Sequence, residues 1–75
     1  PLAREAIYAG IIANRAAPAN DRAYALYRMV YCYAPSGYNG CGGKDVEVDQ
    51  RKAWFNQLKR EYPSSPWAKQ LRFYW

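Results

Sequence analysis

"RAYALYRMVYCY", residues 22–33, repeats apolar side chains at the spacing of an α-helix. The repeat occupies positions i, i+3, i+4, i+7 and i+8, which are Ala23, Leu26, Tyr27, Val30 and Tyr31. We expect an amphipathic helix here, with Asn20 or Asp21 as its N-cap and an end near Tyr33. It is the clearest element in the chain, and the other elements must pack against its apolar stripe.

A weaker helical pattern precedes this segment. Residues 2–17 are rich in alanine, and a helix over this range would stop at Pro18, whose ring cannot continue it. One face of that helix would carry Ala3, Ile7, Gly10, Ile11 and Asn14.

Two more helices are expected after residues 35–45, where four glycines and a proline indicate an irregular loop. The third helix would start at Asp45 or Asp49 and end at Pro63, with Lys59 and Arg60 near its C-terminal end. Its apolar stripe is Trp54, Phe55, Leu58 and Tyr62.

The fourth helix would follow Ser64-Ser65-Pro66, with a serine as N-cap and a proline in the first turn. Its stripe is Trp67, Leu71 and Tyr74.

Together these segments predict an all-α fold. The only alternating stretch, "VEVD" at 46–49, is too short to indicate a strand. The breaks at residues 18–21 and 63–65 are short, so we expect about four short antiparallel helices arranged as helical hairpins. The 75 residues form a single small domain. The sequence begins at Pro1 without a leader pattern, so we expect either a processed product or a fragment of a longer protein.

Residues 53–75, "AWFNQLKREYPSSPWAKQLRFYW", resemble the tetratricopeptide-type helical repeats of bacterial cell-envelope proteins. In those repeats a Tyr-Pro-x-Ser-x-aromatic-Ala segment leads into the next helix, and Tyr62 to Ala68 match this segment throughout. Residues 22–33 are similar to the first helix of such a repeat. The resemblance implies a tetratricopeptide-like stack that binds other proteins. The span from Ala23 to Pro63 exceeds the roughly 34-residue period, and the excess lies in the glycine-rich loop, which suggests a binding face there.

The two cysteines, Cys32 and Cys41, lie at the end of the second helix and inside this loop. A zinc site would need more ligands than two cysteines in a sequence without histidine, and a thioredoxin-like redox pair has a shorter spacing. Two free thiols, one buried and one exposed, are an alternative. A disulfide fits best, because the glycines let the loop turn back, and it would stabilise the fold by about 2–3 kcal/mol.

A disulfide in turn indicates an oxidising compartment. We therefore expect a periplasmic or secreted protein, or the soluble part of an envelope-anchored one. No apolar run approaches the roughly 20 residues that a membrane span requires.

Catalysis is not expected of this chain. Without histidine, neither a Ser-His-Asp nor a Cys-His arrangement can form. Glu47 and Asp49 are better explained as acidic residues at a helix start, and "GCGGKD" at 40–45 lacks the spacing of a phosphate-binding loop. We expect no cofactor and no metal.

The sequence therefore favours a non-catalytic protein–protein interaction or scaffold module. The candidate partner-binding residues lie on the loop side and near the C-terminal end: Tyr33, Tyr38, Lys44, Tyr74 and Trp75. The expected partner is a protein or peptide, and a homo-oligomer through exposed aromatics is a further option. A non-catalytic domain of a larger cell-wall enzyme is also compatible with the sequence.

The alternative function is a polyanion or glycan-binding module of the cell wall. Eight tyrosines and three tryptophans could stack on sugars or bases, and eleven lysines and arginines give a net charge of +5. These cations are scattered rather than gathered in a block, so nucleic acid is not the expected partner.

Overall fold

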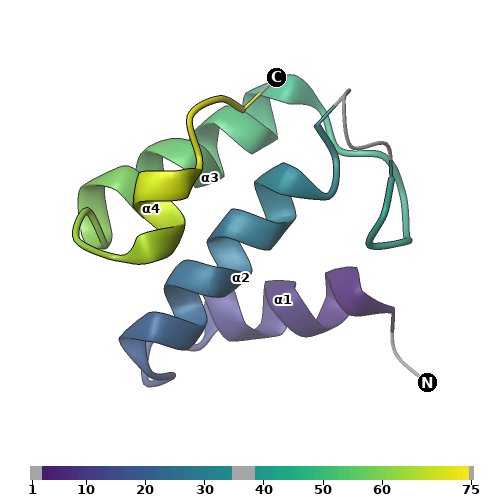
Figure 1. Ribbon diagram of the computed structural model, residues 1–75. Coiled ribbons are helices and arrows are strands. Elements are labelled where there is room, and N and C mark those ends of the chain that lie inside the picture. Colours follow the sequence, from purple (N-terminus) through teal and green to yellow (C-terminus); the bar gives the residue numbers. More distant parts are fainter. Residues whose placement is uncertain (1–2, 35–38, 75) are drawn as a thin grey trace.

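The computed structural model describes residues 3–34 and 39–74, and it confirms the expected all-α fold. Four helices follow one another along the chain, and no strand occurs in the described ranges: α1 Arg4–Ala13, α2 Ala19–Tyr31, α3 Val48–Glu61 and α4 Pro66–Gln70. Helix α2 lies at the centre and packs against the other three, and α1, α2 and α3 alternate in direction (Figure 1).

The main core lies where α2 meets α3 and α4. It is formed by fully or almost fully buried side chains, namely Ala23, Leu26, Val30, Leu58, Ala68 and Leu71. The stripe expected on the second helix is therefore largely correct, except that Tyr31 is 51% exposed. Small alanines in this stripe let the helix axes approach closely, and the leucines and valine fill the remaining space.

The start of α2 differs from the expectation. The helix begins at Ala19 with Pro18 in the N-cap position, and no side chain caps it. Asn20 and Asp21 therefore lie inside the first turn, so their expected capping role is wrong. The side chain of Asn20 instead accepts a hydrogen bond from the indole N–H of Trp67, at 3.3 Å.

Helix α1 is shorter than expected and presents a different face to the core. It ends at Ala13, and the side chain of the C-cap residue Asn14 accepts a hydrogen bond from the backbone N–H of Ala16. Ile7 is 47% exposed, whereas Tyr8 and Ile12 pack against α2. The predicted face was wrong because the large ring of Tyr8 has more area to bury than the side chains that were placed on it.

The apolar stripe of α3 is confirmed, with Leu58 fully buried and Trp54, Phe55 and Tyr62 packed around it. Its start is not as expected, because Glu47 takes the N-cap position and no side chain caps the helix. Asp45 and Asp49 are therefore not caps.

The serine cap of α4 is confirmed, since Ser65 Oγ accepts a hydrogen bond from the backbone N–H of Ala68 at 3.0 Å. The helix ends at Gln70, before Leu71 and Tyr74, so its expected stripe extends beyond it. The segment that follows is held by Arg51, whose Nε donates to the carbonyl of Tyr74 at 2.8 Å.

Cys32 and Cys41 form a disulfide, with their Cα atoms 5.5 Å apart. The disulfide belongs to a second buried cluster, which also contains Met29 and Tyr33. Gly42 and Gly43 have φ angles of 79° and 76°, a backbone region that favours glycine. The loop then lies against the start of α1, where the Glu5 backbone N–H donates to the carbonyl of Cys41 at 3.3 Å. The disulfide thus joins the end of α2 to a loop that covers the beginning of α1.

Across the described residues, no helix combines the length and the apolar character that crossing a membrane requires.

Candidate functional site

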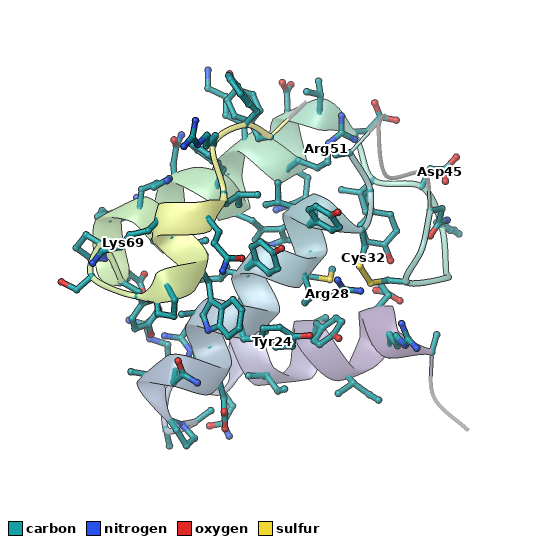
Figure 2. The ribbon with its side chains drawn as sticks, viewed as in Figure 1. Tyr24, Arg28, Cys32, Asp45, Arg51 and Lys69 are labelled. Carbon is teal, nitrogen blue, oxygen red and sulfur yellow. A yellow bond between two sulfur atoms is a disulfide. The ribbon has the colours of Figure 1, made fainter. Side chains whose placement is uncertain are left out.

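Five aromatic side chains from three helices form a continuous surface, which we call the aromatic face: Tyr8, Tyr24, Tyr27, Tyr31 and Trp67. The ring centroids of Tyr24 and Trp67 are 4.8 Å apart, and those of Tyr27 and Trp67 are 5.5 Å apart. Tyr8 extends the face onto α1, and Tyr31 extends it along α2. Figure 2 shows Tyr24 near α1, with Arg28 further along α2 beside Cys32.

The sequence builds this face by helical spacing. Tyr24, Tyr27 and Tyr31 are three and four residues apart, so they lie on one side of α2. Trp67 comes from the first turn of α4, which the Ser65 cap fixes in place. None of the five rings is fully buried, and Tyr31 is the most exposed of them.

The edge of one ring already has a hydrogen-bond partner, because the indole N–H of Trp67 donates to Asn20 Oδ1. Burial raises the pKa of Tyr24 above its ordinary value, and the neighbouring Tyr8 side chain adds to this rise. The Trp67 indole therefore offers its ring face rather than its N–H to a ligand.

Arg28 brings a positive charge to the same face. Its guanidinium carbon lies 5.9 Å from the centre of the Tyr31 ring, and its Nη2 lies 4.0 Å from Cys41 Sγ. Its Nε is buried without a hydrogen-bond partner. Among the residues that the structure describes, no carboxylate forms an ion pair with Arg28.

Two other arginines, Arg22 and Arg51, are buried and have strong partners. Arg22 donates to the carbonyl of Ile12 at 2.8 Å, to the hydroxyl of Tyr62, and to Glu61 Oε1 at 3.3 Å. Arg51 donates to two backbone carbonyls. Both side chains hold elements of the fold together, whereas Arg28 stands beside the exposed rings.

The residues that the sequence nominated for binding are not brought together. Tyr33, a candidate for partner binding that would have to be exposed, is buried: it is 6% exposed and its hydroxyl donates to the carbonyl of Gly42 at 2.6 Å. Burial, with the charges of Glu5 and Asp45, raises the pKa of Tyr33.

Lys44 is exposed in the loop after Gly43. Tyr74 is half-buried, with its ring 5.3 Å from that of Phe55 and the Lys52 ammonium 5.9 Å from its centre. Tyr38 and Trp75 lie outside the described residues. The expected binding site on the loop side is thus reduced, within the described part of the chain, to Lys44 and the edge of Tyr74.

Sequence reasoning missed the aromatic face because it assigned Tyr27, Tyr31 and Trp67 to packing positions. The signal that could have found it is the spacing of Tyr24, Tyr27 and Tyr31, which share one side of the helix beside the Leu26 and Val30 stripe. The contacts of the α2 tyrosines with Tyr8 on α1 and Trp67 on α4 depend on tertiary packing, so no short stretch of the sequence indicates them.

A concave region apart from the aromatic face lies between the start of α2 and the turn before α4. It is an open hollow of about 390 Å³ that includes Asn20, Glu61, Tyr62 and Ser64. The Glu61 carboxylate there is already paired with Arg15 and Arg22. Within residues 3–34 and 39–74, no three His, Cys, Asp or Glu side chains gather where they could hold a metal ion.

Comparison of the chain with protein-family models, with curated proteins and with solved structures gives no match.

Proposed function

We propose that this chain is a non-catalytic protein-interaction module that binds a protein or peptide partner. The observation that carries the proposal is the aromatic face, where Tyr and Trp rings from α1, α2 and α4 stay partly exposed. Tyr, Trp and Arg are the residues that most often dominate the energy of protein interfaces. Here an arginine, Arg28, accompanies the rings.

The helical arrangement supports the same function. Residues 53–75 resemble tetratricopeptide-type repeats, which bind proteins, and the chain folds as successive antiparallel helices (Figure 1). We propose that the chain works as such a repeat unit.

We further propose an exported address, either the periplasm or the cell exterior. The Cys32–Cys41 disulfide supports it, because such bonds form and persist in oxidising compartments.

The test is affinity capture with the folded chain. The disulfide-bonded protein is immobilised and exposed to the exported proteins of the organism that makes it, and the reduced and alkylated chain is the matched control. We expect at least one protein to be retained by the folded chain alone and to bind it again as a purified pair in calorimetry. If no protein meets both conditions, the proposed function is wrong.

A further inference from the structure

The aromatic face fits a partner of a particular chemistry. We propose that this face, with Arg28 beside it, binds a proline-rich peptide segment that carries a carboxylate. The inference rests on the proposed function and adds to it the surface that is used and the chemical class of the segment.

The aromatic face is lined by Tyr and Trp rings, and the Trp67 N–H is already donated to Asn20. A proline-rich segment is well matched, because it lacks many N–H groups, keeps its backbone solvated and docks on surfaces lined by aromatic side chains.

The rings of the face lie at several angles to one another. The planes of Tyr24 and Trp67 meet at 64° and those of Tyr8 and Tyr24 at 79°, whereas Tyr27 and Tyr31 stack at 19°. Pyrrolidine rings, which are small and rigid, can pack against both the stacked faces and the angled edges with little loss of conformational entropy.

Arg28 supplies a positive charge beside the rings. It has no carboxylate partner among the described residues, although Arg22, six positions earlier on the same helix, pairs with Glu61. A carboxylate on the ligand would form a charge-assisted hydrogen bond with the free side of the Arg28 guanidinium. The net charge of +5 also attracts acidic partners over a longer range.

The same charges argue against a second copy of this chain as the occupant. Two copies facing each other through the aromatic face would bring two Arg28 guanidinium groups toward one interface, and each copy carries a net charge of +5. Like charges in an interface oppose association.

Calorimetric titration of the whole disulfide-bonded chain tests the inference. The probe is a synthetic proline-rich peptide with interspersed glutamates, and two control peptides replace its glutamates by lysines or its prolines by glycines. We expect the acidic proline-rich peptide to bind and each control to bind about tenfold more weakly or worse. On binding, the amide or indole NMR signals of Tyr27 and Trp67 should shift.

Protein variants identify the surface. Tyr31→Ala and Arg28→Gln should each weaken binding of the acidic peptide by about tenfold, whereas Val48→Ala, an exposed apolar residue at the start of α3, should leave it unchanged. Circular dichroism verifies that each variant is folded, and a variant that does not fold is replaced by Tyr31→Ser or Arg28→Met.

Several results would overturn the inference. They are the absence of binding, equal binding of the lysine peptide, unchanged binding by the folded Tyr31 and Arg28 variants, and binding of an N-acetylglucosamine oligosaccharide in place of the peptide. A captured protein that binds those two variants as tightly as the unchanged chain would refute this inference and leave the proposed function standing. A chain that captures neither protein nor peptide contradicts both.

Discussion

Arg22 Nη1 lies 3.3 Å from Glu61 Oε1, and this contact joins the centre of the fold to the end of α3. Arg15 Nη1 lies at the same distance from the same oxygen. The two arginines differ in burial, because the Arg22 side chain is 3% exposed and that of Arg15 is 70% exposed. Arg22 also donates to the carbonyl of Ile12 and thus reaches the end of α1.

This difference predicts unequal effects on stability. Arg22→Leu removes three partners and leaves the Ile12 carbonyl unsatisfied, so we expect the free energy of unfolding to fall by about 2–3 kcal/mol. Arg15→Gln removes an exposed ion pair and should cost less than about 0.5 kcal/mol. Urea unfolding followed by circular dichroism measures both, and equal losses would show that the Arg22 contacts do not hold the helices together.

Two glycines should respond in opposite directions to alanine. Gly43 has a positive φ, and a Cβ there would meet Glu5 Oε2 at 3.0 Å. Gly43→Ala should therefore destabilise the fold by at least about 1 kcal/mol. Gly10 lies in α1 with no atom within 4 Å of an added Cβ, so Gly10→Ala should stabilise by about 0.5–1 kcal/mol. A stabilising Gly43→Ala, measured by thermal unfolding, would contradict the described loop conformation.

Removing the disulfide should destabilise the fold and free the loop from α1. We expect the double substitution Cys32→Ala and Cys41→Ala to lower the free energy of unfolding by about 2–3 kcal/mol. Hydrogen exchange at the Glu5 amide, which donates to the carbonyl of Cys41, should accelerate more than exchange in α3. Uniform acceleration along the chain would mean that the loop does not open as a separate unit.

Stability should fall at high pH through Tyr33. Burial raises the pKa of Tyr33 in the folded chain above the unfolded value of about 10. The folded chain thus holds the phenolic proton more tightly, so this contribution to stability is complete below pH 10 and is lost as the pH rises through the folded pKa.

Tyr33→Phe tests this dependence. At pH 7 it should cost about 1 kcal/mol, because the hydrogen bond to the Gly42 carbonyl is lost. The gap between the variant and the unchanged chain should narrow above pH 10. Tyr31→Phe at pH 7 is the matched control, and its exposed side chain should make the change nearly neutral. A gap that stays constant to pH 11 would argue against the buried environment of Tyr33.

The central elements of the fold could be predicted because their signals are local. The stripe of α2 repeats at helical spacing, and Ser65 followed by Pro66 is a strong start signal for α4. The disulfide was predictable because the glycines after Cys32 let the chain turn back.

The misassigned features depend on tertiary contacts. Asn20 does not cap α2 because the helix already begins at Ala19, after Pro18, and the Asn20 side chain accepts a hydrogen bond from the Trp67 indole instead. In the alanine-rich α1 the apolar pattern is weak, so the large ring of Tyr8, which packs against Tyr24, determines which face turns inward. Tyr33 was expected on the binding surface because it adjoins the glycine-rich loop. The sequence does not reveal the second buried cluster to which it belongs. The aromatic face is assembled from side chains of α1, α2 and α4, so no single segment of the sequence predicts it.

The most direct test of the account is photo-crosslinking from the aromatic face inside the organism that makes the protein. A benzophenone amino acid replaces Tyr31, which is 51% exposed, and in a control chain it replaces Val48, which is 45% exposed on α3. We predict that the Tyr31 position crosslinks to one exported protein at a segment rich in proline and acidic residues, and that the Val48 position does not. Equal crosslinking from both positions, or none from Tyr31, would contradict the claim that this face binds a partner.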